Sequence, residues 1–464
     1  MQSHTHHSDT TSPPSSSFAL TSLDHLIFPV YLGGVLTFDL RGRDKVECLK
    51  LLEAGIATLA THYPFLAGCV VPAPDTDKRI NSFEVRSDLG DGTPFFQVQD
   101  QLPTTPLLID GRLNPEFSPT PELFDPSGPC PVMRVQANIQ GDSLNFVSCH
   151  HHMVSDGMGT NVVGAALAQL LREPDTSHAK HLSHLGSSSK PEALKWDIKP
   201  LSFPLLGLED PKYKTLNLRY PIRKDKICLL QQACRTLMQE SPLEEEKCVL
   251  LSTSLIVGSL FAICTQRARH AAGLGNLYGS KFGFAVNLRE KLGLSPSYMG
   301  NAVISADSPF NTQVLPFTSA STTPIVSGVR SVDVHQVCNM ALSINQELEG
   351  YTQSHVAGML GTLDAVANRS SVRASFEGLA FSDLHKMEFY RDYGPLGWVQ
   401  DMAIPGNDLG GVAWLLPNKP TPSGSQAPDH FELQVALERV SMEELVKDPL
   451  FQWVTGNAPS VSKL

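Results

Sequence analysis

The sequence lacks the features of disulfide-stabilised, membrane-spanning and nucleic-acid-binding proteins. None of its nine cysteines belongs to a CxxC pair, which favours reduced thiols over a disulfide framework or a structural zinc site. The longest apolar stretch, 249–264, is shorter than the roughly 20 residues that cross a bilayer. Acidic residues outnumber basic ones, and the formal net charge of -11 argues against a nucleic-acid partner, which would need a basic face.

An apolar N-terminal secretion segment is also missing. The chain begins with a polar stretch rich in Ser, Thr and Pro over 1–17, which we expect to be a disordered tail. The remainder has an ordinary globular composition, because 41% of the 464 residues are hydrophobic and 18% are charged. This length is too great for one simple core and predicts two domains of about 200 residues each.

Strand-like and helix-like segments alternate along the chain, which predicts an α/β or α+β fold with mixed sheets. A stretch punctuated by Pro and Ser over 176–215 is typical of a long crossover between domains. We therefore expect a first domain over 18–175, a second domain over 216–455 and a flexible tail over 456–464.

Apolar periodicity places several elements within these domains. The first domain is predicted to hold strand-like pieces in 23–40, a helix from 46 to Pro64, a strand over 143–152 and a helix over 157–173. The second domain is predicted to hold helices over 246–269 and 334–350, strands over 281–288 and 430–437, and a surface loop over 307–328. A last helix is predicted to begin at Ser441, because Glu444 would complete a capping box.

The strand predicted over 143–152 ends in three histidines, and a short loop leads from them into the helix predicted over 157–173. Alternation along a strand places His150 and His152 on one face and His151 on the other. The loop contains Asp156 and Gly157, and a strand-to-helix turn of this kind presents a side chain to a cleft on rigid support. The glycine permits a tight turn and the close approach of other backbone.

The residues alone leave three interpretations of this cluster open. In the first, His152 is a structural histidine. In the second, His150, His152 and Asp156 bind a metal ion, although the spacing matches neither HxHxDH nor HExxH and no later histidine cluster completes a site. In the third, His152 is a general base supported by Asp156, since imidazole titrates near neutrality. We expect the neighbouring Cys149 to be a buried structural thiol, because no activating pattern surrounds it.

Several segments resemble one enzyme family. The run HHMVSDG over 151–157 resembles the HHxxxDG signature of the BAHD acyltransferases, which nonribosomal peptide condensation domains of the same chloramphenicol-acetyltransferase-like fold also carry. The run DYGPLGW over 392–398 resembles the looser DFG motif of fungal BAHD members. AVNLREKL with the following YMGN is similar to the family's VDxRxR and YxGN motifs, with Asn287 in place of the usual Asp. With LTSLDHLIFPVY and HYPFLAG, the resemblance spans about 20–455.

The resemblance implies an acyl-CoA-dependent acyltransferase of two similar domains, with an active-site tunnel between them. His152 would take the proton of an attacking acceptor, and the acyl group would pass directly from coenzyme A without an acyl-enzyme. Asp156 would point away from the substrate and pair with Arg289. Structural roles away from the chemistry fall to Asn301, Asp392, Gly394 and Gly397, the last three on a loop towards the cofactor side.

The same resemblance implies a monomer without a metal or a permanently bound cofactor, which uses acyl-CoA as co-substrate and a hydroxyl of a small secondary metabolite as acceptor. Two rival functions share the fold: a condensation-type catalyst that uses carrier-bound thioesters, and a non-catalytic small-molecule binding protein. A basic cluster follows the crossover and could meet coenzyme A phosphates, but we interpret it as a solvated face; it consists of Lys212, Lys214, Arg219, Arg223, Lys224 and Lys226.

The chain ends in Ser462-Lys463-Leu464. The peroxisomal import receptor reads this tripeptide at a free C-terminus. The sequence therefore predicts a peroxisomal location, with the import receptor as a protein partner and the peroxisomal acyl-CoA pool as a source of donor.

Overall fold

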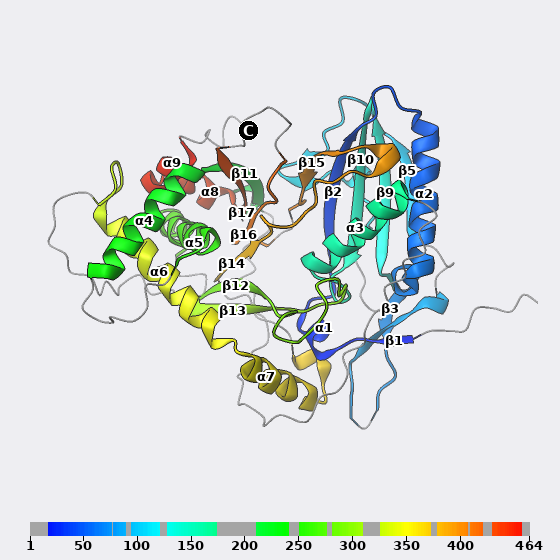
Figure 1. Ribbon diagram of the computed structural model, residues 1–464, viewed down its shortest axis with the longest axis horizontal. Helices are drawn as coiled ribbons and strands as arrows, with labels where there is room; N and C mark the ends of the chain where they lie inside the picture. The colour runs from blue at the N-terminus through cyan, green and yellow to red at the C-terminus, as the bar shows by residue number, and fades with distance from the viewer. Residues whose placement is uncertain are drawn as a thin grey trace, which may run out of the picture.

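The computed structural model describes residues 17–456 apart from 77, 90–93, 121–127, 174–209, 241–249, 276–280, 310–324, 373–377, 407–408 and 421–428. Two large sheets, each packed against helices, lie beside each other (Figure 1). Both sheets mix parallel and antiparallel pairs, which confirms the predicted α/β class. Most of the predicted crossover over 176–215 and of the C-terminal tail lies outside the described residues.

The N-terminal half is built on a five-stranded sheet in the order β15-β2-β10-β9-β5. Its strands are β2 (Tyr31–Asp39), β5 (Phe95–Asp100), β9 (Met133–Gln140), β10 (Ser143–His151) and β15 (Val399–Ala403). β9 and β10 form an antiparallel hairpin. Gly141 in its turn has a φ of 58°, a left-handed conformation that glycine adopts without steric cost.

Two helices, α2 (Lys45–His62) and α3 (Gly157–Arg172), pack against each other and against this sheet (Figure 1). Asp44 begins α2, because its carboxylate accepts from the backbone N–H groups of Val46 and Glu47. The helix ends before Pro64, as predicted, since proline cannot continue the hydrogen-bond ladder. The buried faces of both helices extend the core of the sheet through residues such as Leu52 and Leu167.

The C-terminal half is built on a six-stranded sheet in the order β11-β17-β16-β14-β12-β13. Its strands are β11 (Thr215–Arg223), β12 (Lys281–Asn287), β13 (Val303–Pro309), β14 (Gly378–Asp383), β16 (Val412–Leu415) and β17 (His430–Glu438). Its helices are α4 (Lys224–Glu240), α5 (Thr253–Ala271), α6 (Ser331–Gly350), α7 (Gln353–Ala365), α8 (Arg439–Leu445) and α9 (Pro449–Thr455).

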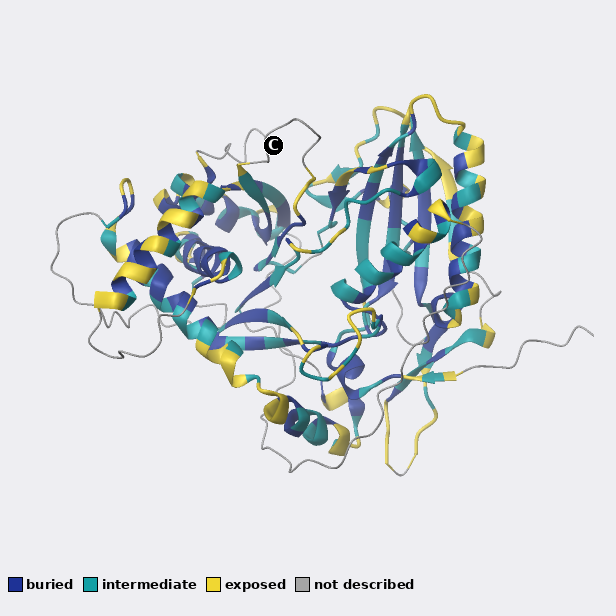
Figure 2. Cartoon of the chain, in the orientation of Figure 1, coloured by how far each residue is buried: buried dark blue, intermediate teal, exposed yellow. Residues whose placement is uncertain are grey.

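The longest apolar stretch of the sequence becomes α5, which is buried along most of its length (Figure 2). It packs against α6 and α8 and against the aromatic residues of β12 and β14, among them Phe282 and Phe381. Among the described residues, no helix is both long and apolar enough to span a membrane.

The two halves exchange segments. β15 comes from the late part of the chain, yet it pairs antiparallel with β2 in the N-terminal sheet. In the opposite direction, α1 (Ser22–Leu26) comes from the start of the chain and packs against α7 of the C-terminal half (Figure 1). Side chains at the boundary between the two halves are therefore held by elements of both halves.

Smaller elements complete the described chain. A four-stranded sheet has the order β1-β4-β3-β8, and a two-stranded hairpin pairs β6 with β7. Their bounds are β1 (Ser17–Ala19), β3 (Cys69–Pro72), β4 (Phe83–Arg86), β6 (Leu108–Ile109), β7 (Arg112–Leu113) and β8 (Cys130–Pro131).

Four predicted elements differ from the structure. The prediction that a helix begins at Ser441 is wrong, because α8 begins at Arg439 and Ser441 lies inside it, fully buried. Residues 22–26 form the helix α1 rather than a strand, since Thr21 and Asp24 make a capping box there. The described start of the predicted loop over 307–328 belongs to β13, and α5 begins after its cap Ser252 rather than at 246.

Candidate active site

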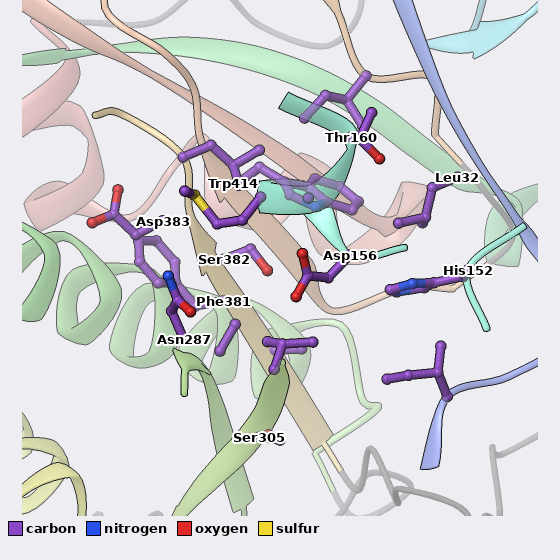
Figure 3. A pocket seen from close by; sticks show the side chains of 18 of the residues that line it. Leu32, His152, Asp156, Thr160, Asn287, Ser305, Phe381, Ser382, Asp383 and Trp414 are labelled. Carbon is purple, nitrogen blue, oxygen red and sulfur yellow. The ribbon is translucent and has the colours of Figure 1, made fainter. Parts of the chain in front are cut away.

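A cavity of about 1080 Å³ lies between the two halves. The N-terminal half contributes β2, β7, the end of β10 and the start of α3, and the C-terminal half contributes β12, β13, β14 and β16. Figure 3 shows Leu32 and His152 on one side of it and Phe381 and Trp414 on the other. The cavity is large enough for a drug-sized molecule, since ligand pockets commonly measure about 300–1,000 Å³.

His152 directly follows β10 and lines the cavity. Its backbone N–H donates to the carbonyl of Val30 at 2.7 Å, and its own carbonyl accepts from Nδ2 of Asn301 at 2.8 Å. The ring extends towards the middle of the cavity (Figure 3). The main chain at His152 is thus held from both sides while the side chain meets the open space.

The hydrogen bond of the ring fixes its tautomer. Nδ1 lies 3.2 Å from the carbonyl oxygen of Ser155, and because a carbonyl only accepts, Nδ1 carries the proton and Nε2 keeps a lone pair. Burial lowers the pKa of His152, while the Ser155 carbonyl and the Asp156 carboxylate oppose that change. The imidazole is consequently neutral near neutral pH, the state that a general base requires.

Asp156 lies at the N-cap of α3 and pairs with Arg289. Nη1 and Nη2 of Arg289 donate to the two carboxylate oxygens at 2.9 and 2.8 Å. The backbone N–H groups of Gly159 and Ala302 also donate to this carboxylate, at 2.8 and 2.9 Å. The pair that the resemblance implied is therefore brought together, in a buried position where it ties the loop after β10 to the segment after β12.

The guanidinium of Arg289 also holds the backbone of its own half. It donates to the carbonyls of Tyr298 and Gly300 at 3.0 and 2.8 Å. Asn287, which stands where the family usually has Asp, accepts from the backbone N–H of Arg289 at 3.0 Å. A neutral amide is sufficient at this position, because Asp156 already balances the charge of Arg289.

The other two histidines of the cluster do not line the cavity. The alternation along β10 does not extend to His152, since the strand ends at His151. The ring of His150 is hydrogen-bonded to the hydroxyl of Ser148 at 2.8 Å, and the ring of His151 packs edge-on against Tyr31. Burial lowers the pKa of both rings to about 4, so both are neutral.

The arrangement does not favour the metal interpretation of His150, His152 and Asp156. The carboxylate oxygens of Asp156 are taken by Arg289 and by backbone N–H groups. Across the described part of the chain, no three His, Cys, Asp or Glu side chains gather as a metal site. Cys149 does line the cavity, but burial raises the pKa of its thiol to about 12, which leaves it protonated and a poor nucleophile.

The need for glycine at the start of α3 lies at Gly159 rather than at Gly157. A Cβ at Gly157 would make ordinary contacts with Leu384 and Met387 at 3.7 Å. A Cβ at Gly159 would collide with the backbone carbonyl of Met299. The close backbone approach that we expected after Asp156 therefore occurs two residues later, although Gly157 does line the cavity.

The DFG-like loop over 392–398 is clamped onto the N-terminal half, away from the cavity lining. Asp392 accepts from the backbone N–H of Gly394 at 3.0 Å, and its carbonyl accepts from Arg172 at 2.7 Å. Gly394 and Gly397 have φ values of 59° and 80°, which other residues rarely adopt. Arg43 donates to the carbonyl of Pro395 within the loop at 2.8 Å.

The basic cluster after the crossover lies just before β11, along β11 and at the start of α4. Its members pair with neighbouring carboxylates or lie over aromatic rings, as Lys214 does with Asp110 at 2.8 Å and Lys226 does with Trp453. None of the six lines the cavity.

Sequence patterns did not single out the opposite wall of the cavity, formed by Ser382, Asp383 and Trp414. These residues come from β14 and β16, which are parallel neighbours in the sheet but carry no shared motif. Only the three-dimensional pairing of the strands brings them opposite His152 (Figure 3). The C-terminal tripeptide lies outside the described residues.

Comparison with known proteins adds independent findings, although no protein-family model matches the sequence. The chain is 23% identical to O-acetyltransferase ptmV of Penicillium ochrochloron over 97% of this chain and 98% of the relative. It is 24% identical to fumigaclavine B O-acetyltransferase easN of Aspergillus fumigatus over 94% and 97%. F. graminearum TRI101 in complex with ethyl coenzyme A has the same fold, with a TM-score of 0.67, 16% identity and coverage of 95% and 99%.

The similarity runs from end to end of both curated relatives, so it does not depend on one short motif. It coincides with a cavity between two halves, a neutral histidine that faces it and a buried Asp156–Arg289 pair beneath that histidine. The chain is thus similar over nearly its whole length to fungal O-acetyltransferases, and it shares the fold of TRI101.

Proposed function

We propose that the chain transfers an acyl group, with acetyl the first candidate, from acyl-coenzyme A to a hydroxyl of a small secondary metabolite. Nε2 of His152 takes the proton of the hydroxyl as its oxygen attacks the thioester carbonyl. The new C–O bond forms, the C–S bond breaks, and the thiolate of coenzyme A takes the proton back from His152. The acyl group passes directly to the acceptor without an acyl-enzyme.

The observation that carries the proposal is the state of His152. Its Nδ1–H is committed to the carbonyl of Ser155, so Nε2 keeps the lone pair, and the residue lines the cavity. The protonated thiol of Cys149 is unsuited to covalent catalysis. A direct transfer needs only a base and two bound substrates, and this arrangement supplies the base.

The choice of donor and acceptor is supported by the relatives. Both curated proteins are O-acetyltransferases, one of them acting on fumigaclavine B, and the TRI101 structure holds ethyl coenzyme A. The cavity fits an acceptor with apolar surface, because Leu32, Phe381 and Trp414 line it.

The proposal is tested with purified protein, a panel of acyl-CoAs and an extract of hydroxylated metabolites. Free coenzyme A is followed with a thiol reagent and the product by its mass shift. We expect His152→Ala to lower the rate about 10²- to 10⁴-fold, the usual contribution of general base catalysis. His150→Gln is the matched control: it alters a neighbouring buried histidine outside the cavity lining and should retain activity.

The opposite result has a clear meaning. If the folded wild-type protein releases no coenzyme A from any donor, the proposal is wrong. Activity with a carrier-bound thioester would then indicate a condensation-type catalyst, and saturable coenzyme A binding without turnover would indicate a binding protein.

We also propose that the protein is imported into peroxisomes through Ser462-Lys463-Leu464. A fluorescent protein fused to the N-terminus leaves this tripeptide free. The fusion should give a punctate signal that co-localises with a peroxisomal marker and becomes diffuse when Leu464 is deleted. A diffuse signal with the intact C-terminus would contradict the proposal.

A further inference from the structure

Asp24 is a buried carboxyl group that the mechanism above does not use. It belongs to the short helix α1, and only 4% of its surface is exposed. One carboxylate oxygen accepts from the backbone N–H and the hydroxyl of Thr21 at 2.6 and 2.7 Å. The other accepts from Nδ2 of Asn301 at 2.9 Å.

The same amide nitrogen of Asn301 donates to the carbonyl of His152 at 2.8 Å. An amide nitrogen carries two hydrogens, so both are used, one towards Asp24 and one towards His152. Asn301 is itself fully buried. The three residues therefore form one hydrogen-bonded chain from α1 to the backbone of the histidine that faces the cavity.

The helix α1, which carries Asp24, is anchored in the C-terminal half. The hydroxyl of Ser22 donates to the carboxylate of Asp364 and accepts from Nη1 of Arg369 at 3.0 Å. Arg369 also donates to the carbonyl of Leu363 at 2.6 Å. The apolar face of α1 packs against α7 and β13 in the same place. Asp24 thus stands on a support that is fixed independently of the loop after β10.

We infer that Asp24 is a positioning residue for His152 and acts through Asn301. The inference rests on the proposed function in one respect, namely that His152 is the base. Without the carboxylate, the Asn301 amide loses the acceptor that fixes its orientation, and the His152 carbonyl loses a fixed donor. The imidazole then shifts relative to the acceptor hydroxyl, and small displacements of a catalytic group lower the rate strongly.

The test is a double-mutant cycle of Asp24→Ala and Asn301→Ala. We expect each variant to lower kcat about 10- to 100-fold with little change in the KM for acyl-CoA. Because Asp24 and Asn301 act on His152 through the same series of hydrogen bonds, kcat of the double variant should fall no further than kcat of the worse single variant. Asp24→Asn, which keeps an oxygen that can accept from Asn301, should retain more activity than Asp24→Ala.

Ser22→Ala is the matched control on the same helix. It removes contacts to Asp364 and Arg369 but leaves the chain from Asp24 to His152 intact. We expect it to lower the melting temperature while kcat stays near the wild-type value. The inference is overturned if Ser22→Ala and Asp24→Ala lower kcat equally at matched stability, or if the effects of Asp24→Ala and Asn301→Ala simply multiply.

A second measurement is independent of turnover and separates this inference from the proposed function. NMR of protein with ¹⁵N-labelled histidine reports which ring nitrogen of His152 carries the proton, and His152→Gln assigns the signal. The wild-type protein should show one tautomer protonated at Nδ1, and Asp24→Ala should show exchange between tautomers. An unchanged signal in Asp24→Ala would refute positioning, even in a protein that proved inactive.

Discussion

Two buried arginine–carboxylate pairs of this protein have similar geometry and different places in the fold. Arg289–Asp156 and Arg269–Glu438 each have a closest contact of 2.8 Å and side chains at most 4% exposed. The first joins the two halves beneath His152. The second joins α5 to the end of β17 within the C-terminal half. Similar chemistry therefore stabilises the segments around His152 at the candidate site in one case and the C-terminal sheet in the other.

Replacing each arginine by Met should separate these roles and gives the largest expected effect. Arg289→Met leaves the Asp156 carboxylate buried without its partner, and losing one member of such a pair typically costs about 3–5 kcal/mol of stability. Arg269→Met should cost a similar amount because Glu438 is equally buried. Urea unfolding measures both losses.

The two variants should differ in catalysis. We expect Arg289→Met to lower kcat at least about 100-fold, because the loop after β10 loses its anchor to the other half. The folded fraction of Arg269→Met should keep kcat within about threefold of wild type, since this pair does not line the cavity. Equal losses of kcat would show that any buried pair matters for activity only through folding.

The first pair, Arg289–Asp156, could be predicted from the sequence, whereas the second, Arg269–Glu438, could not. Asp156 and Arg289 were identified because each belongs to a motif with family resemblance, although 133 residues separate them. Arg269 and Glu438 belong to no motif, and they meet only because α5 packs against the C-terminal sheet. Local patterns likewise predicted β10, α2 and α3 well, because apolar periodicity and a terminal proline are local signals.

Predictions failed where tertiary contacts decide the local structure. Ser441 and Glu444 have capping-box spacing, but β17 leads directly into α8 and places Ser441 inside the helix. β15 was assigned to the second domain by its position in the chain, yet it pairs with β2. Asp24 was part of a segment with family resemblance but not recognised as a site residue, since its partner Asn301 lies 277 positions away.

Measuring stability as a function of pH should sharpen the difference between the segments around His152 and the C-terminal sheet. Burial raises the pKa of Asp24 from 3.8 to about 6. The folded protein therefore holds this proton more tightly than the unfolded chain, and the resulting stability is full below pH 4 and is lost as pH rises through 6. A shift of this size corresponds to at most roughly 3 kcal/mol.

The comparison is made between wild type and Asp24→Asn, which cannot titrate at this position. Relative to the variant, the wild-type protein should lose stability between pH 4 and 6 and then level off. The side chains that face Asp24 are those of Thr21, Asn301 and Tyr298; burial raises the pKa of the Tyr298 phenol, so it stays neutral in this window. Parallel stability curves for the two proteins would contradict a raised pKa at Asp24.

Two glycine substitutions give the smallest expected effect and test how rigid each region is. A Cβ at Gly159 meets the backbone carbonyl of Met299, which cannot move without displacing Gly300 and Asn301 beside His152. The nearest atoms to a Cβ at Gly258 in α5 are ring carbons of Phe282, Phe284 and Phe381 at 3.3–3.4 Å. Gly159→Ala should therefore cost about 1–3 kcal/mol, the usual penalty of overpacking, and should lower kcat.

Gly258→Ala should change stability by less than about 1 kcal/mol, because the rings can shift slightly and alanine favours the helix. If Gly258→Ala lowered kcat more than Gly159→Ala, the segments around His152 would not be the more rigid region, and the position of His152 would depend on the C-terminal sheet.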